Sequence, residues 1–396
     1  MTKKSIHILL LSGLMLSLGL FSCDKMEDFH SEFLQGGEII YSEKPDSTYS
    51  FPGKDRIKLG WLLVSASRVT QCAVYWNAGE NMKMVEVPAG EDSVWVETLL
   101  EDMEEKSYIF EIYTLDKDGN RSVKVEEFGV VYGEKYQATL SNRDYLNAKY
   151  SLDENRLTID WFPAEENAVG VEAYYVDKSG TSHELFIPNE KEQTVIENFA
   201  FEGEFRYKTL LLPDEKAIDT FYTESQSVKI TEIDLKNSNY PIQHGEWDGK
   251  RWGMPKDWIV SESAKNQAGY GGFDGTDEGG YFSMEKWTEN EEDKIINGKI
   301  YQVMTLPPGT YQLKANFSDG EAGFDVKDEA YLVVTPGNNF LNIDDLTPAL
   351  GYASFNQAEV EFTLEEETEI SMGLITTFEQ PYQYFRCYSV RLLKTN

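Results

Sequence analysis

The chain has 396 residues with 69 acidic and 36 basic side chains, for a net charge of −33 at neutral pH. Such a surface repels nucleic acid and anionic lipid, so neither is expected as a partner. The aromatic content of 13% excludes a disordered chain, and the length predicts two or three packed domains.

The first predicted element is an export signal. Lys3 and Lys4 precede an apolar run over residues 6–20, which is shorter than the roughly 18 to 20 residues that span a bilayer. The run ends in Leu-Phe-Ser-Cys, which resembles a bacterial lipobox and implies that Cys23 carries a lipid anchor. The alternative is an ordinary signal peptide that a cysteine happens to follow.

An acidic segment follows this cysteine at once. Asp24, Glu27 and Asp28 resemble the export tags of Bacteroidetes lipoproteins, which implies an outer-membrane location on the cell surface. A periplasm-facing anchor is the alternative. We therefore assign residues 1–22 to the lipoprotein signal peptide and residues 23–40 to an anchor and linker.

The next two hundred residues contain a weak repeat. RIKLGW (56–61) returns as RLTIDW (156–161), and SYIFEIYTLDKDGNRS (107–122) returns as FRYKTLLLPDEKAIDT (205–220). Apolar and polar residues alternate within these runs, which is typical of strands in an antiparallel sandwich. The repeat predicts one sandwich over residues 41–133 and a second over residues 134–232.

Each repeat resembles a fibronectin type III domain. The resemblance depends on a tryptophan in the second strand and on a late Tyr-x-Phe-x-Ile strand, which the first copy matches better than the second. It implies that Trp61 and Trp161 fill the two cores and that Tyr108 and Tyr207 each pin a corner through the hydroxyl. Roles for these four residues in ligand binding are the alternative.

Two cysteines remain after the lipobox. Cys72 falls in the first predicted sandwich and Cys387 near the C-terminus, in different domains. We expect two buried thiols rather than a disulfide.

Residues 233–396 form the third predicted domain. Half of the eight tryptophans lie in its Gly-rich opening, which is loop composition between short strands. Alternating strands follow over residues 299–317, 330–337, 358–375 and 384–394. The segment YQVMTLPPGTY, taken as a hairpin, and the final strand resemble galactose-binding-like jelly rolls of carbohydrate-binding modules. The aspartate common in that last strand is replaced by Tyr388. The expected fold is all-β: two fibronectin type III-like sandwiches followed by a jelly-roll β-sandwich.

A sugar site needs exposed aromatic rings beside polar side chains, because sugars present C–H patches and hydroxyls. In the third domain, Trp258 is expected in the core, and the face that Trp287 occupies stays undecided. The candidate ligand-binding residues are Trp247, Asp248, Arg251, Trp252, Tyr270 and Asp274.

No motif points to catalysis. His30, His183 and His244 lack the spacing of a metal site, and the chain has no nucleophile elbow. A pair of catalytic carboxylates is not singled out among so many acids. We expect no enzyme and no cofactor. Asp274, Asp277 and Glu278 could hold calcium, but they lack the full spacing of a calcium loop, and a solvated turn is the alternative.

The opening CDKMEDFHSEFLQGGEIIYSEKPDS resembles an uncharacterised surface lipoprotein family of gut Bacteroidetes. Some members lie beside glycan-import systems. The resemblance implies a surface protein that binds a glycan and works with import partners. A structural or adhesive protein is the first alternative, and a glycoside-active enzyme is the second.

Overall fold

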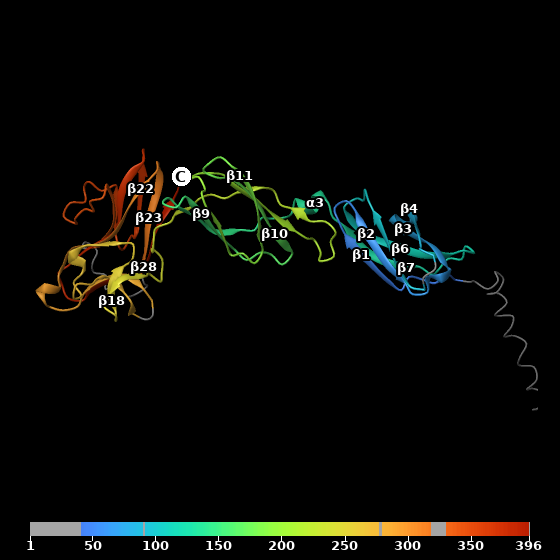
Figure 1. Ribbon diagram of the computed structural model, residues 1–396, viewed down its shortest axis with the longest axis horizontal. Helices are drawn as coiled ribbons and strands as arrows, with labels where there is room; N and C mark the ends of the chain where they lie inside the picture. The colour runs from blue at the N-terminus through green and yellow to red at the C-terminus, as the bar shows by residue number, and fades with distance from the viewer. Residues whose placement is uncertain (1–40, 90–91, 277–278, 318–329, 396) are drawn as a thin grey trace, which may run out of the picture. The chain divides into compact units, whose positions relative to one another are not determined.

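The computed structural model describes residues 41–89, 92–276, 279–317 and 330–395. These residues form strands and loops with only short helical turns, so the predicted all-β class is confirmed (Figure 1). The chain divides into two compact units, Met1–Thr139 with Leu212–Phe221 and Leu140–Leu211 with Tyr222–Asn396. Within the described ranges, no helix is long and apolar enough to cross a membrane. The predicted signal peptide and Cys23 lie outside the described residues.

The first unit contains a sandwich of three strands on four. One sheet has the order β1 (Ser47–Pro52), β2 (Ile57–Leu63) and β5 (Val94–Leu100). The other has the order β4 (Asn81–Glu86), β3 (Val69–Trp76), β6 (Lys106–Asp116) and β7 (Val125–Val131). This is the strand arrangement of a fibronectin type III domain, and the alternating residues of β2 supply its core.

The second sandwich repeats the arrangement. One sheet contains β8 (Tyr145–Ser151), β9 (Arg156–Trp161) and β12 (Gln193–Ile196). The other contains β11 (Ser182–Pro188), β10 (Ala168–Val176), β13 (Phe205–Leu211) and the short β15 (Gln226–Ser227). The segment Leu212–Phe221 is grouped with the first unit, where Asp219 accepts hydrogen bonds from Nε and Nη2 of Arg56 at 2.9 and 2.5 Å.

The repeated aromatic residues have the expected structural roles. Trp61 and Trp161 are buried in the two cores. The Tyr108 hydroxyl donates to the carbonyl oxygen of Glu104 at 3.0 Å, and the Tyr207 hydroxyl donates to that of Arg143 at 2.8 Å. Each hydroxyl therefore ties its strand to a neighbouring segment of the chain, as in a tyrosine corner.

The thiols of the two described cysteines are buried and unpaired, which confirms that prediction. Burial raises the pKa of Cys72 to about 11 and that of Cys387 to about 12, so neither thiol is a ready nucleophile.

Two packed sheets make up the third domain. One contains β26 (Glu359–Leu364), β23 (Gly309–Phe317), β28 (Gln383–Lys394), β21 (Tyr281–Lys286), β20 (Gly272–Asp274), β18 (Trp252–Pro255) and β17 (His244–Trp247). The other contains β19 (Ile259–Val260), β22 (Ile295–Leu306), β27 (Thr368–Phe378), β24 (Ala330–Pro336) and β25 (Gly351–Ser354). Their inner faces form one core, as expected of a jelly roll. Trp258 belongs to this core, as predicted.

The predicted hairpin around Leu306-Pro-Pro-Gly309 is wrong. β22 pairs with β19 and β27, whereas β23 pairs with β26 and β28, so the turn carries the chain from one sheet to the other. Two successive prolines cannot donate the backbone hydrogen bonds of a two-stranded ladder. The Tyr311 hydroxyl donates to the carbonyl oxygen of Pro307 at 2.8 Å and so stabilises the turn between the two sheets.

A short strand joins the second sandwich to the third domain. β16 (Glu232–Ile233) pairs in parallel with β8 and antiparallel with β28, so one sheet continues through both. Buried Glu232 accepts from Nε and Nη2 of Arg391 at 3.1 and 2.5 Å, and Nζ of Lys149 lies 3.6 Å from its carboxylate. The boundary predicted between residues 232 and 233 falls inside this strand.

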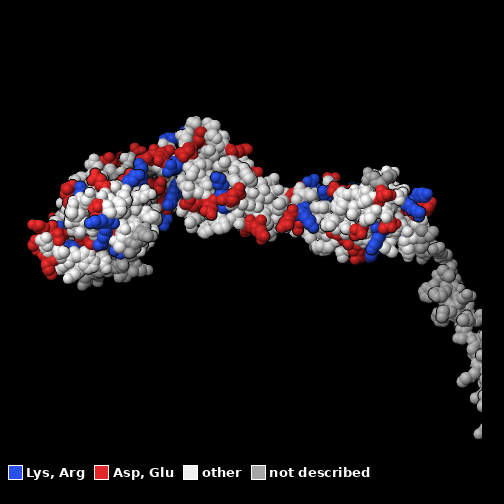
Figure 2. Space-filling model, turned by 60° about the horizontal axis from the view of Figure 1, so that its bottom comes forward, with Lys and Arg blue, Asp and Glu red and all other residues white. Residues whose placement is uncertain are grey.

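On the face drawn in Figure 2, acidic side chains are interspersed with lysine and arginine rather than gathered in one block. This distribution fits an exterior that stays in solution by self-repulsion.

Candidate functional site

The hairpin between β17 and β18 contains four of the predicted ligand residues in succession. Oδ1 of Asp248 accepts from the backbone amides of Lys250, Arg251 and Trp252 at 2.7, 2.9 and 3.1 Å. Desolvation opposes ionisation of Asp248, but these three amides outweigh it and lower its pKa. Asp248 therefore shapes the turn that presents the next two side chains.

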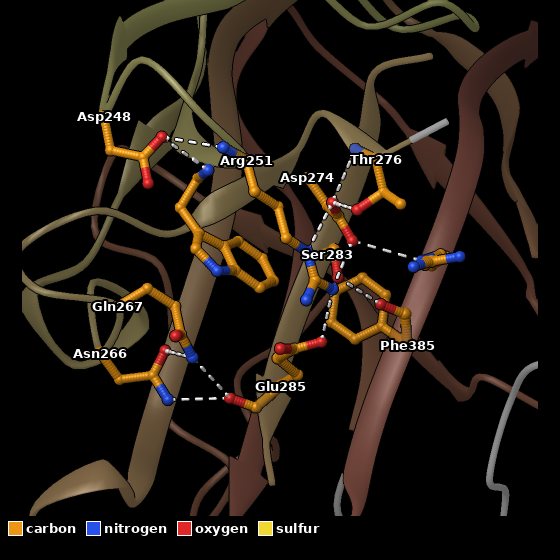
Figure 3. A network of polar contacts seen from close by, with 11 residues as sticks. Asp248, Arg251, Asn266, Gln267, Asp274, Thr276, Ser283, Glu285 and Phe385 are labelled. Carbon is orange, nitrogen blue, oxygen red and sulfur yellow. Dashed lines mark hydrogen bonds and ion pairs between the residues drawn. The ribbon is translucent and has the colours of Figure 1, made fainter. Parts of the chain in front are cut away.

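Arg251 is the centre of a polar network (Figure 3). Its Nε and Nη2 donate to the two oxygens of Asp274 at 3.0 and 2.8 Å, and Nη2 also donates to Glu285 at 2.8 Å. The guanidinium lies 4.1 Å from the centre of the Trp252 ring. Arg251 thus links the turn to β20 and β21 and covers one face of the indole.

Asp274 is fully buried and is satisfied within the protein. Besides Arg251, its carboxylate accepts from the amide and hydroxyl of Thr276 at 2.9 and 2.5 Å and from Nε of Arg386 at 3.3 Å. Burial opposes its ionisation, but the hydrogen bonds from Arg251 and Thr276 outweigh burial and lower its pKa. Asp274 therefore positions the side chains of the two arginines.

The pKa of Glu285 is shifted in the opposite direction. Burial raises its pKa, and the hydrogen bond from Trp287 and the charge of Arg251 only partly offset that effect. The Glu285 carboxylate therefore connects the arginine to a tryptophan at the end of β21.

Strand register places these residues on one face of the sheet. Asp274 lies opposite both Trp252 and Tyr281, and Glu285 lies opposite Tyr384. The intervening residues of β20, β21 and β28 point into the core. Loops cover part of the outward face: Asn266 and Gln267 both donate to the backbone carbonyl of Glu285 (Figure 3).

Trp287 is an exposed aromatic residue beside this network. It is 45% exposed. Its ring centre lies 5.2 Å from that of Tyr384, with the two rings nearly parallel, and 5.8 Å from that of Tyr382, with those rings nearly perpendicular. The sequence left the face of Trp287 undecided and did not single out either tyrosine. The alternation of Tyr384, Arg386 and Tyr388 along the final strand was the signal that could have found them.

A second aromatic cluster lies on the other side of Arg386. Tyr240, Tyr281 and Tyr388 have ring centres between 5.1 and 5.5 Å apart. Burial, with a hydrogen bond shared with Tyr240, raises the pKa of Tyr281 to about 12. Aromatic rings therefore flank the ion network on both sides.

The last two predicted residues lie at the margin. Trp247 is exposed, and its ring stacks on His244 at 4.7 Å. Tyr270 is half-buried in the loop before β20, where its backbone pairs with Gln267. The structure thus brings Asp248, Arg251, Trp252 and Asp274 together and leaves Trp247 and Tyr270 beside them.

Only part of the predicted calcium site lies within the residues that the structure describes. Asp277 and Glu278 lie outside the described residues, as does His30, and the Asp274 carboxylate is taken by the two arginines. Across the described ranges, no three acidic, histidine or cysteine side chains are grouped to hold a metal ion.

Comparison with known families decides the relationship of the chain. A family model described as a domain of unknown function, DUF4998, matches residues 23–221, which is half of the chain. The chain belongs to the DUF4998 family. A second family model, also described as a domain of unknown function (DUF5013), matches residues 236–373, so the candidate network is shared between that span and β28.

The other comparisons add little to this relationship. The search of curated proteins found no match. Among solved structures, the chain is similar to the two fibronectin type III domain segment from chicken tenascin, with 14% identity over 47% of this chain and 97% of that one. The TM-score is 0.20, and a similarity this weak carries no weight for fold or function.

Proposed function

We propose that this protein is a non-catalytic, lipid-anchored protein of the bacterial cell surface that binds a glycan on the outward face of β21 and β28. The observation that carries the proposal is Trp287, an exposed indole held against Tyr384 beside the Arg251–Glu285 pair. An exposed aromatic face takes the C–H patches of a sugar ring, and neighbouring charged groups take its hydroxyls.

The network beneath the surface supports this role through preorganisation. Asp274 holds Arg251 from below, and Arg251 and Trp287 hold Glu285 from two sides. A platform whose polar groups are already oriented loses little side-chain entropy when a ligand binds. In this proposal Arg251 and Trp287 contact the sugar, and the buried Glu285 and Asp274 keep them in place.

Glu285 also bears on the choice between binding and catalysis. Its raised pKa is a property that a general acid would share. Its carboxylate is nevertheless tied to Arg251 at 2.8 Å, and the other buried acid, Asp274, is tied to the same guanidinium. Two carboxylates tied to Arg251, one of them also to Arg386, favour a structural network over an acid and a nucleophile facing a substrate.

The lipid anchor in this proposal is Cys23. The short apolar run that ends in Leu-Phe-Ser-Cys supports acylation at this residue, and two or more acyl chains suffice for stable anchoring. The acidic residues after it support export to the outer face of the outer membrane. Glycan-import proteins in the same membrane are the partners this location suggests.

A glycan array probed with the purified full chain tests the proposal. We expect binding to one class of neutral glycan, because a chain of net charge −33 disfavours acidic ones. Binding to no glycan would refute the proposal and favour a structural or adhesive protein. Release of shorter sugars from a bound glycan would instead make the protein an enzyme.

A further inference from the structure

Two groups of aromatic rings lie on the outward face of the third domain, one at each side of the ion network. They are the tryptophan cluster of Trp287, Tyr382 and Tyr384, and the tyrosine cluster of Tyr240, Tyr281 and Tyr388. The proposed function depends on the tryptophan cluster alone. The tyrosine cluster presents a second aromatic surface on the same face of the sheet.

Tyr240 makes the tyrosine cluster accessible to a ligand. The residue is 46% exposed, about as much as Trp287. Its ring lies so close to the backbone of Gly279 that a Cβ atom at that position would collide with it. Tyr388 packs against the same ring, with the ring centres 5.5 Å apart and the two planes at 69°. The Tyr240 ring is therefore supported from below and keeps part of its surface open to solvent.

A β-bulge lies at Tyr388, where β28 meets the tyrosine cluster. The register between β28 and β23 shifts by one residue between Cys387 and Ser389, so Tyr388 is the extra residue of β28. Burial changes its alternation at the same point, because Cys387 is buried before the bulge and Val390 after it. Bulges aim side chains and are frequent next to functional sites. Tyr388 thus shares the outward face with Tyr384, which belongs to the tryptophan cluster.

The two clusters are too far apart for one sugar ring to contact both. Tyr384 and Tyr388 are four residues apart in β28, and four residues of a strand span about 13 Å. Arg386 lies between them, and Arg251 approaches from β18, since Asp274 accepts hydrogen bonds from both arginines. Both arginines are half-buried, so each retains surface for a ligand. Guanidinium groups between two aromatic surfaces suit a chain of sugar units, whose hydroxyls accept from them.

We propose that the outward face binds an extended oligosaccharide that lies along β28, rather than a single or terminal sugar. This inference rests on the proposed function and names the class of glycan that the site takes. One unit of the chain stacks on Trp287, a later unit stacks on Tyr240, and the units between accept hydrogen bonds from Arg251 and Arg386. Once one unit is bound, the second stacking contact forms within the same complex, so the affinity rises with chain length.

Isothermal titration of the full chain with oligosaccharides of increasing length tests the inference. The probes are cello-, xylo-, manno- and maltooligosaccharides, each as a series from one to six units. In a series that binds, we expect the hexasaccharide to bind at least about tenfold more tightly than the disaccharide. Equal affinity for both lengths would overturn the inference and leave the proposed function intact. Binding of no series would overturn both.

Variants separate the second contact from the larger number of positions that a long chain offers to a single site. Tyr240→Ala should weaken binding of the hexasaccharide about tenfold and leave that of the disaccharide unchanged, because only the longer chain reaches the tyrosine cluster. The unchanged disaccharide affinity also shows that the domain remains folded. Tyr240→Phe keeps the ring and should bind the hexasaccharide as tightly as the unaltered protein.

The matched control is Tyr352→Ala, which removes a 53% exposed tyrosine of β25 in the other sheet and should change neither affinity. Undiminished binding of the hexasaccharide by Tyr240→Ala would overturn the inference. An equal loss for the disaccharide and the hexasaccharide would overturn it as well, because the tyrosine cluster would then not be a separate contact.

Discussion

Replacement of Asp274 by asparagine should destabilise the second unit by about 3 kcal/mol. The carboxylate is fully buried and accepts from Arg251, Thr276 and Arg386, and an amide of the same shape cannot compensate two guanidinium groups. Removal of one partner from a buried ion pair costs about 3 to 5 kcal/mol. The low end applies because Arg251 keeps Glu285 and its side chain remains 36% exposed to water.

Thermal unfolding of the full chain measures this loss. For a unit of this size, about 3 kcal/mol lowers the melting temperature of its transition by roughly 6 to 12 °C. Asp153→Asn is the matched control, because Asp153 pairs with Lys236 at the surface of the same unit and should change little. If the two variants melt together, Asp274 is not the support of the network and the site described above is wrong.

The pH dependence of stability gives an independent check. The pKa of Asp274 is lower in the folded protein, so its contribution is present above its ordinary pKa of 3.8 and is lost as the pH falls through the folded value. Ionisation of Glu285 affects stability with the opposite sign, because its pKa is raised in the folded protein and its ionised form therefore lowers the stability at neutral pH. The stability of Asp274→Asn should therefore fall less steeply below pH 3.8 than that of the unaltered protein. If both proteins lose stability equally in acid, the lowered pKa of Asp274 is contradicted.

Three further predictions concern other parts of the chain. Glu232→Gln should lower the stability by about 3 kcal/mol, because it breaks buried contacts with Arg391 and Lys149. The second sandwich and the third domain should still unfold in one calorimetric transition. Two separate transitions would contradict the shared sheet. Tyr207→Phe should cost about 1 to 2 kcal/mol in denaturant titrations, because it leaves the Arg143 carbonyl without its donor, and no change would refute the corner. Cys23→Ala should release the protein from membranes and abolish labelling with a palmitate analogue; a labelled, membrane-bound variant would disprove the anchor.

The repeated sandwiches were predictable because burial in them follows strand alternation. In β2 the residues Ile57, Leu59 and Trp61 are buried as their spacing indicates, and β9 repeats the pattern. The tyrosine corners were predictable for the same reason, since each depends on one residue at a fixed place in a strand. Neither requires knowledge of distant contacts.

The network was less predictable because its members meet only through sheet pairing. All six residues of β21 are buried, the apolar ones by the core and the polar ones by loops, so alternation could not show which face Trp287 occupies. Asp274 lies in a Gly-rich segment that suggests exposure, but Arg251, 23 positions away, and Arg386, 112 positions away, enclose it. The crossing at Leu306-Pro-Pro-Gly309 was taken for a hairpin because a local turn signal does not say which sheet the next strand joins.

Titration of the full chain with its glycan is the most direct test of the central claim, that the outward face of β21 and β28 binds sugar. Trp287→Ala should weaken binding by about 1 to 3 kcal/mol, the loss expected for a stacking aromatic residue, while the melting temperature stays nearly unchanged. Trp95→Ala, which removes an exposed tryptophan of the first sandwich, should leave the affinity intact. Undiminished binding by Trp287→Ala would contradict the claim and place the sugar elsewhere.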